Sequence, residues 1–458
     1  MKAKQEQKFF LITALLTFFF ILTAQTFWST IHGDGAVYAY LIKQISKSGF
    51  FLTELPNWNV TEKFAEHPYL FFIFGSWFTK LFGYSDLAVK LPNYFITAVT
   101  ISFLYLLSKK RNVEQHRAAA IGVLTGYVLF FNPTYLHQVS QPTLDPLAQL
   151  LALISVFFIL SDKNYFISGI IIGLAFLTKG LELLPNLGAI CLVIIFQNYK
   201  MPGELTKKLL KFVSATIFII LLWLAYDRLI LHGEWLRTYW YRQFESRFFM
   251  KSNMQSVFDL GFLKTFVSLY FIEIILFSVG LFRLSKSKKI FPLIKNDFLW
   301  SYFLAYTVLN LIAFLLIKKD SSQHMTGIIL TGSLLLAELL YDLFANLQIK
   351  KIKITAACIL VVSFIYWSRY MINRNENPDI WTAVKVTADE INQKNSDLPI
   401  VIKKTDGQYY GVFYTSLWYL NSKKVYTFEE SQSLLVGKEV ITIEVTPEQT
   451  VKYLIEKL

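Results

Sequence analysis

The stretch FFLITALLTFFFILTAQTFW, residues 9–28, decides the fold class of this chain. It contains no charged residue, and as an α-helix it would extend over about 30 Å, the thickness of the hydrocarbon core of a bilayer. It has no small-residue cleavage site, and further apolar runs follow it. We therefore expect a retained first membrane helix rather than a signal peptide.

The composition of the whole chain agrees with this expectation. Of 458 residues, 54% are hydrophobic, 17% are aromatic and only 17% are charged. Apolar runs long enough to cross a membrane recur about ten times, which is typical of a polytopic membrane protein. Cys191 and Cys358 both lie inside such runs and do not indicate a disulfide.

The net charge of +13 would suggest a nucleic-acid partner in a soluble protein. Here the Lys and Arg residues gather in short segments between apolar runs, so they mark topology, and the positive-inside rule assigns them to the cytoplasmic side. These basic segments are 2–8, 109–117, 200–211, 283–289 and 350–353.

Placing these segments inside predicts an all-α membrane domain with about 11 transmembrane helices, the N-terminus cytoplasmic and the C-terminus outside. The stretch 68–82 is short for a span, and we expect it to lie in the outer interface, within a long outer loop 29–84. The expected spans are 9–28, 85–108, 118–133, 145–161, 165–180, 183–198, 212–230, 262–282, 297–317, 324–342 and 354–370.

The composition changes after Arg369, where long apolar runs stop and a turn-rich linker follows. Residues 371–458 are expected to form a small extracytoplasmic α/β domain, separate from the membrane domain 1–370. Its expected elements are a helix over 378–393, strands over 398–402, 424–428 and 439–445, and a closing amphipathic helix over 446–457.

Polar residues in the first outer loop are the first candidates for chemistry. Asp34 lies between Gly33 and Gly35 and opens a helical pattern with Tyr38 on the same side. It is either a helix N-cap, a general base, or both. Glu66 and His67 precede Pro68; this pair could bind a divalent metal, contact a phosphate or begin a helix. No cofactor is certain.

Further candidates lie at the outer ends of later spans. Asp145 precedes a proline, as at an ordinary helix start. Basic residues on the outer side run against the positive-inside bias, so we expect a phosphate partner or snorkelling to headgroups. They are Lys179, Lys318, Lys319 and His324, together with Arg237, Arg242 and Arg247 in the aromatic outer loop 231–261, which is either an anion-binding rim or an aromatic belt.

These motifs resemble a known series. Gly33-Asp34 with Tyr38, Glu66-His67-Pro68, Phe82-Gly83 and Lys90-Leu91-Pro92 are similar to motifs of the GT-C glycosyltransferases in the protein O-mannosyltransferase and aminoarabinose (lipid A) transferase superfamily. The most specific match is Gly173-Leu174-Ala175-Phe176-Leu177-Thr178-Lys179-Gly180. The chain departs from the pattern at Tyr69 and Leu181, where the family has proline, and at Phe244, where many aminoarabinose transferase relatives have His.

The resemblance implies a GT-C fold and transfer of a sugar from a polyprenyl-phosphate donor to a lipid, glycan or protein acceptor, with inversion, on the outer face of a bacterial cytoplasmic membrane. It implies that Asp34 is the catalytic base and Asp145 the second acidic position. It assigns Lys179, Lys318, Lys319 and His324 to the departing phosphate. The alternatives are a membrane transporter or lipid flippase, and a scaffold whose outer domain binds a partner.

Overall fold

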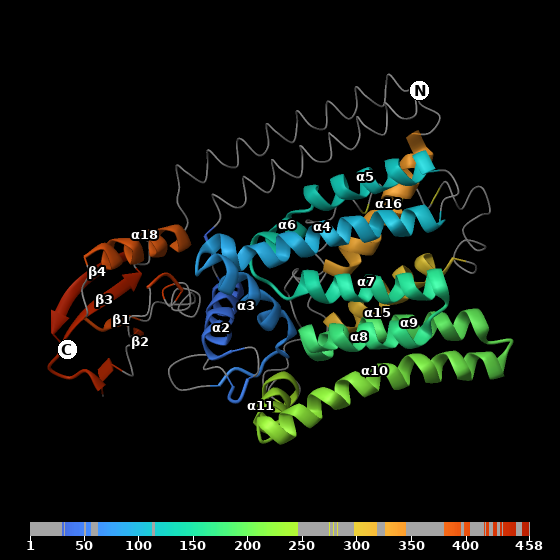
Figure 1. The fold of residues 1–458 in the computed structure, drawn as a ribbon. Coiled ribbons are helices and arrows are strands. Elements are labelled where there is room, and N and C mark those ends of the chain that lie inside the picture. Colours follow the sequence, from blue (N-terminus) through green and yellow to red (C-terminus); the bar gives the residue numbers. More distant parts are fainter. Residues whose placement is uncertain are drawn as a thin grey trace.

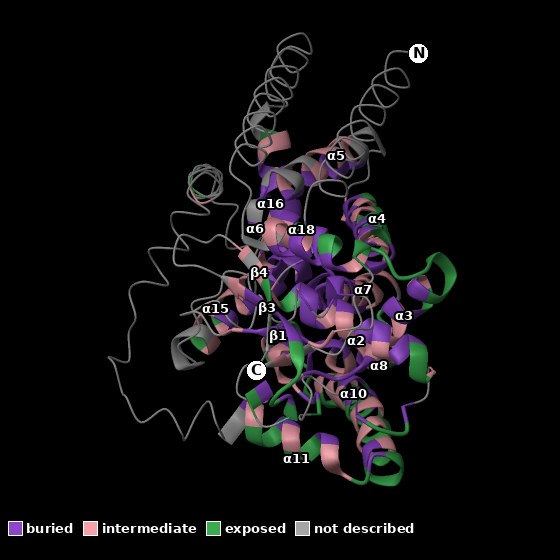
Figure 2. Ribbon diagram, turned by 90° about the vertical axis from the view of Figure 1, so that its left-hand side faces the viewer, coloured by how far each residue is buried: buried purple, intermediate pink, exposed green. Residues whose placement is uncertain are grey.

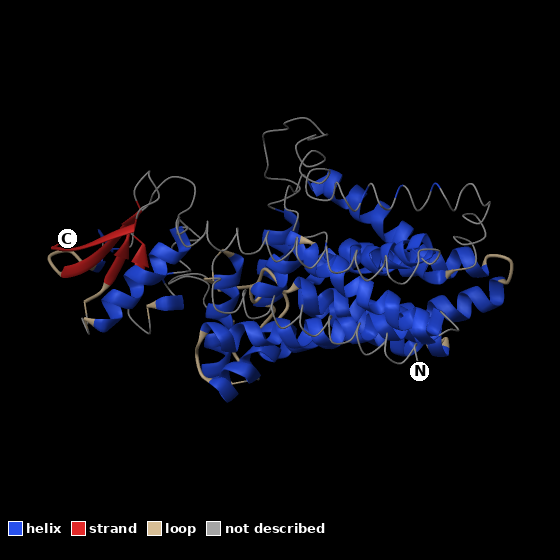
Figure 3. Cartoon of the chain, turned by 90° about the horizontal axis from the view of Figure 1, so that it is seen from above, coloured by secondary structure: helices blue, strands red, loops and turns tan. Residues whose placement is uncertain are grey.

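In the computed structural model, the described residues are 30–49, 52–55, 63–111, 115–245, 297–317, 326–344, 380–394, 398–403 and 416–457, with short gaps in the first and last of these ranges, and the single residues 274, 278 and 282. Figure 1 shows a helical bundle with a β-sheet at one end, and α2 and α3 lie between the two. Figure 3, seen from above, shows the strands confined to that end.

Long apolar helices form the bundle. Their bounds lie within a few residues of the expected spans, except that α10 begins ten residues before its span (212–230), within the basic segment. Periodic apolar sequence thus placed these helices correctly. They are α4 (Asp86–Arg111), α5 (Gln115–Phe131), α7 (Asp145–Asp162), α8 (Tyr165–Lys179), α9 (Leu184–Asn198), α10 (Pro202–Ile230), α15 (Phe298–Ile317) and α16 (Thr326–Phe344).

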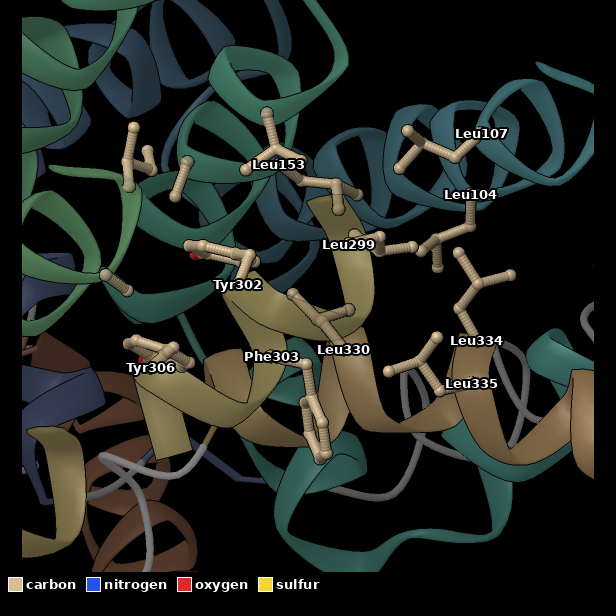
Figure 4. Close-up of a cluster of buried hydrophobic side chains, with 14 of the residues drawn as sticks. Leu104, Leu107, Leu153, Leu299, Tyr302, Phe303, Tyr306, Leu330, Leu334 and Leu335 are labelled. Atoms are coloured by element: carbon tan, nitrogen blue, oxygen red, sulfur yellow. The ribbon is translucent and has the colours of Figure 1, made fainter. Parts of the chain in front are cut away.

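Apolar side chains of α4, α7, α15 and α16 form one interlocking cluster (Figure 4), which includes Leu104, Leu153, Leu299 and Leu334. Figure 2 shows the buried residues gathered around α7 in the middle of the bundle. The large apolar residues exposed on α10, such as Phe218 and Leu221, face outward. An apolar outer surface on a helix of this length is typical of a lipid-facing span.

Three helical runs in the described part of the chain are long and apolar enough to cross a membrane: Asp86–Arg111, Tyr165–Asn198 and Pro202–Ile230. A fourth is obtained if a bent pair of helices, described below, counts as one span. The expected spans 9–28 and 354–370, and nearly all of 262–282, lie outside the described residues. The total of about 11 spans therefore stays a prediction.

The run Tyr165–Asn198 reverses direction at Gly180, whose φ of 68° lies in the left-handed region that favours glycine. Gly169 lies against Phe212, and Gly173 lies against Ile219, so α8 and α10 run in the same direction. The intervening α9 must then return along the bundle. A Cβ on Gly169 would approach the Phe212 carbonyl oxygen to 2.2 Å, so glycine is what allows the two helices to come this close.

A helix that the sequence did not predict, α6 (Pro133–Ser140), precedes α7 and is bent from it by 109°. Asn132 caps α6 by accepting a hydrogen bond from the Tyr135 N–H at 3.0 Å. The chain between the two helices passes close to Asn93 of α4, whose side-chain amide donates to the carbonyl oxygens of Gln141 and Thr143. This bend brings the beginning of α7 to the α2 end of the bundle.

The first outer loop is partly helical, as expected, with α2 (Asp34–Ser48) and α3 (Leu70–Phe82). Ile42 of α2 packs against Gly75 of α3, where an added Cβ would approach its Cδ1 to 2.7 Å. Pro68 does not begin the helix, because Tyr69 stands at its N-cap and α3 starts at Leu70. Trp77, Leu81 and Phe82 are exposed along α3, which is consistent with the expected position in a membrane interface.

The C-terminal residues form a helix, α18 (Ile380–Gln393), and a four-stranded sheet of order β2-β1-β3-β4. β1 pairs in parallel with β2 and β3, whereas β3 and β4 are antiparallel. Parallel β1 is buried on both faces, which explains its continuous apolar sequence. The strands are β1 (Ile400–Ile402), β2 (Val425–Thr427), β3 (Glu439–Val445) and β4 (Val451–Lys457).

The expected helix over 446–457 is wrong, because β4 is a strand. Val451 pairs with Val445 at the start of the antiparallel ladder. Val451, Tyr453 and Ile455 alternate with other residues and face one side of a strand, a period of two that overrides the weak helical pattern. Pairing with the free edge of β3 satisfies the backbone hydrogen bonds of this segment.

Candidate active site

Asp34 is the first residue of α2 and is exposed. Gly33 precedes it with a φ of 54° and occupies the N-cap position of α2, so Asp34 is not the N-cap residue of this helix. Gly35 packs against Gln141 between α6 and α7, where a Cβ would approach the Gln141 Oε1 to 2.6 Å.

Four carboxylates lie near enough to the hydroxyl of Tyr38, one turn further along α2, to influence its pKa. Burial raises the pKa of this hydroxyl well above its ordinary value, and the carboxylates raise it further, so Tyr38 stays protonated and can donate a hydrogen bond. They belong to Asp34, Glu66, Glu182 and Asp145. Residues far apart in the sequence thus meet around the first turns of α2.

Lys179 lies between two of these carboxylates at the C-terminal end of α8. Its Nζ pairs with Asp145 and lies 2.9 Å from the Glu182 Oε2. Lys179 is only 5% exposed. Leu144 occupies the N-cap position of α7 and Asp145 is the first residue of the helix, so Asp145 is not the N-cap residue that its proline neighbour suggested. The group formed by Lys179 and the two carboxylates carries a net negative charge. Because the local dielectric constant is low, this charge produces a strong electric field.

Glu66 and His67 also lie near Tyr38. The His67 and Tyr38 rings meet edge to face, with centroids 6.1 Å apart. Glu66 accepts a hydrogen bond from Arg242 at 3.2 Å. Arg242 belongs to a π-helical turn, Tyr241–Glu245, that follows α11 (Glu234–Trp240). The Arg242–Glu66 ion pair joins the aromatic loop 231–261 to the loop 29–84, which contains Asp34.

The position of α11 is fixed by several contacts. Asp227 accepts hydrogen bonds from the N–H groups of Trp235 and Leu236. The Tyr239 hydroxyl accepts a hydrogen bond from the Leu181 N–H at 2.8 Å, directly beside Gly180. The end of α8 that holds Lys179 is therefore packed against α11. Arg237 lies exposed on α11, and among the described residues no ion pair joins it to the carboxylates around Tyr38.

Comparison with known proteins identifies the fold that carries these residues. Residues 66–226 match the family model described as dolichyl-phosphate-mannose-protein mannosyltransferase. The whole fold is similar to ArnT from Cupriavidus metallidurans bound to undecaprenyl phosphate, with a TM-score of 0.63, 15% identity, and coverage of 96% of this chain and 93% of that one. The chain has the GT-C fold.

A second GT-C structure shares this fold. It is the archaeal oligosaccharyltransferase AglB from Archaeoglobus fulgidus in complex with an inhibitory peptide and a dolichol-phosphate. The TM-score is 0.53 at 12% identity, and the match covers 90% of this chain but 64% of AglB. None of the curated proteins matches the chain in sequence. The sequence resemblance to GT-C glycosyltransferases is thus confirmed at the level of fold.

Not every expected site residue can be placed in this GT-C chain. Arg247, Lys318, Lys319 and His324 lie outside the described residues. Gly327 of α16, three residues after His324, lies near the first turns of α7. A Cβ on Gly327 would touch Gln149 of α7 and the Tyr306 hydroxyl. Within the part of the chain that the structure describes, no three His, Cys, Asp or Glu side chains are grouped to hold a metal, and Glu66 is paired with Arg242.

Sequence reasoning missed two polar residues that shape the site. Asn93 directly follows the Lys90-Leu91-Pro92 motif and ties α4 to the bend before α7. The side-chain amide of Gln141 in that bend donates to the Thr30 carbonyl oxygen at 2.9 Å. Asn93 could have been found as a polar residue within an apolar helix, directly after the Lys90-Leu91-Pro92 motif. Nothing in the sequence marks Gln141.

Proposed function

We propose that this GT-C protein is an integral-membrane glycosyltransferase that moves a sugar from a polyprenyl-phosphate donor to an acceptor on the outer face of the membrane. The observation that carries the proposal is the convergence of Asp34, Glu66, Asp145 and Glu182 on Tyr38 at one end of the bundle. The family match over 66–226, and the undecaprenyl phosphate and dolichol-phosphate in the names of similar structures, support the choice of donor.

In the proposed reaction, the acceptor oxygen attacks the anomeric carbon while the bond from that carbon to the lipid phosphate breaks. Asp34 accepts the acceptor proton, a role that fits its exposed position as the first residue of α2. Tyr38, kept protonated by burial and nearby carboxylates, donates a hydrogen bond in the same region. Inversion at the sugar follows from attack opposite the leaving phosphate.

The lipid phosphate gains negative charge as it leaves, so cations around it would stabilise the transition state. We assign this task to Lys318, Lys319 and His324, whose segment ends just before Gly327 and its contacts with Gln149 and Tyr306. Lys179 contributes by orienting Asp145 and Glu182. Arg242 pairs with Glu66, and we assign Arg237, Arg242 and Arg247 to binding of the anionic donor.

The same proposal sets the topology. Residues 1–370 form the catalytic membrane domain with about 11 spans, and residues 371–458 form a domain on the extracytoplasmic side of a bacterial cytoplasmic membrane. The transferred group is a hexose or pentose, amino sugars included, and the acceptor is lipid A, another glycan or a protein.

The test compares Asp34→Asn with Glu54→Gln, an exposed acid in the same outer loop. Mass spectrometry of envelope glycolipids and glycoproteins, from cells with and without the gene, identifies the sugar and acceptor. Purified variants are then assayed with that donor. We expect Asp34→Asn to bind undecaprenyl phosphate like the wild type but to lose at least about 1,000-fold in transfer rate, as for removal of a catalytic base. Transfer at the wild-type rate in Asp34→Asn would show that Asp34 is not the base.

A further inference from the structure

Two hydrogen bonds fix the peptide group between Thr30 and Ile31, shortly before Asp34. The Thr30 carbonyl oxygen accepts from the side-chain amide of Gln141 at 2.9 Å, and the Ile31 N–H donates to the Tyr419 hydroxyl at 3.0 Å. Carbonyl and N–H belong to the same peptide plane. Ile31 is fully buried, and Tyr419 is 8% exposed. We call this arrangement the peptide clamp.

The two sides of the peptide clamp come from different parts of the protein. Gln141 lies in the bend between α6 and α7, whereas Tyr419 belongs to the C-terminal domain, 388 residues from Ile31. Tyr419 is itself fixed, because its hydroxyl donates to the Asp86 Oδ2 at 2.8 Å. Burial and the Asp86 carboxylate raise the pKa of this hydroxyl, so it stays protonated and keeps donating to Asp86 while it accepts from Ile31.

Asp86, the first residue of α4, gathers further groups of the C-terminal domain. Its carboxylate also accepts from the Trp418 Nε1 at 2.9 Å and pairs with the Lys385 Nζ at 3.2 Å. Lys43 of α2 lies 5.7 Å from the centre of the Trp418 ring. The C-terminal domain thus docks on the beginning of α4 and along α2, and Tyr419 alone among these docking groups reaches the backbone that leads to Asp34.

We propose that the C-terminal domain is a positioning element of the active site, and that Tyr419 is its positioning residue. Gly33, with its left-handed φ of 54°, lies two residues after Ile31 and directly before Asp34, so a small rotation of the Thr30–Ile31 peptide group would move the Asp34 carboxylate. Displacement of a reacting group by about 1 Å costs up to a hundredfold in rate. The inference rests on the proposed role of Asp34 and adds a function for the domain.

The test compares Tyr419→Phe with Trp418→Phe in the full-length purified protein. Each variant removes one hydrogen bond to Asp86 from a buried aromatic residue, but only Tyr419→Phe removes the acceptor of the Ile31 N–H. We expect Tyr419→Phe to speed amide hydrogen exchange of a peptide covering 29–36 about tenfold. We expect its kcat to fall tenfold to about a hundredfold at unchanged KM for the donor. Trp418→Phe should stay within about twofold of wild type in both measurements.

A second variant keeps the test independent of domain docking. Gln141→Met removes the other side of the peptide clamp, which comes from the bend between α6 and α7 and not from the C-terminal domain, so it should raise exchange over 29–36 and lower kcat as Tyr419→Phe does. Equal behaviour of Tyr419→Phe and Trp418→Phe would overturn the inference, and so would faster exchange with unchanged kcat. Failure of the proposed function has a different signature, namely wild-type transfer by Asp34→Asn.

Discussion

Replacement of Lys179 by methionine should destabilise the protein by about 3–5 kcal/mol, because it leaves two largely buried carboxylates without their shared cation. Asp145 and Glu182 both pair with Lys179, whose side chain is only 5% exposed. Methionine has a similar length and is apolar, so the change removes charge with little change of volume. The penalty is the desolvation of carboxylates that have lost their partner.

Asp145→Asn should cost less, about 1–2 kcal/mol, because Lys179 keeps Glu182. At the 2.9 Å between the Lys179 Nζ and the Glu182 Oε2, with an effective dielectric of about 20, the remaining attraction is about 6 kcal/mol before desolvation is subtracted. The lysine charge therefore stays compensated. Lys179→Met should therefore lower the free energy of unfolding at least twice as much as Asp145→Asn does.

Unfolding by a denaturing detergent, followed by circular dichroism, measures these free energies. Lys63→Met is the matched control, because Lys63 pairs with Glu234 at 2.6 Å while the two side chains are 50% and 42% exposed. It should cost less than about 1 kcal/mol. A Lys179→Met protein as stable as the wild type, or a ranking in which Asp145→Asn costs more than Lys179→Met, would refute the reasoning about this buried cluster.

Three further predictions test other parts of the structure. Gly169→Ala should destabilise by more than about 2 kcal/mol in the same unfolding assay, because its Cβ would meet the backbone of α10, whereas Gly126→Ala, with open space around it, should stabilise by up to about 1 kcal/mol. Asp86→Asn should make the C-terminal domain more sensitive to limited proteolysis, since Asp86 accepts from three groups of that domain; unchanged cleavage would contradict this. Tyr38→Phe should slow transfer without moving either limb of the pH profile between about pH 6 and pH 9, since the raised pKa of Tyr38 keeps its hydroxyl protonated throughout, and a shifted alkaline limb would argue otherwise.

The helices of the bundle were predictable because long apolar runs leave the backbone few alternatives in a membrane. Strand β3 was predicted with its observed bounds, Glu439–Val445, since its β-branched residues stand out in a polar region. Strand β4 was not, because its identity depends on pairing with β3 rather than on its own pattern. Helix α6 is short, and the bend that follows it depends on Asn93 from another helix.

The site was predictable only as a set of separate candidates. The sequence indicated Asp34, Glu66, Asp145 and Lys179 one by one, but their convergence on Tyr38 depends on the reversal at Gly180 and the bend before Asp145. Local rules suggested helix caps for the aspartates, and tertiary contacts overrode them at Asp145. The contact of Tyr419 with Ile31 has no local signal at all.

The peptide clamp also orders the events of biosynthesis. Ile31 is made early, but the hydroxyl that holds its N–H belongs to a residue added 388 positions later. The backbone before Asp34 cannot reach its final geometry until Tyr419 has been synthesised and the C-terminal domain has folded. We expect a nascent chain in which this domain has not yet docked to be inserted but inactive, so that consumption of the lipid-linked donor begins only after docking.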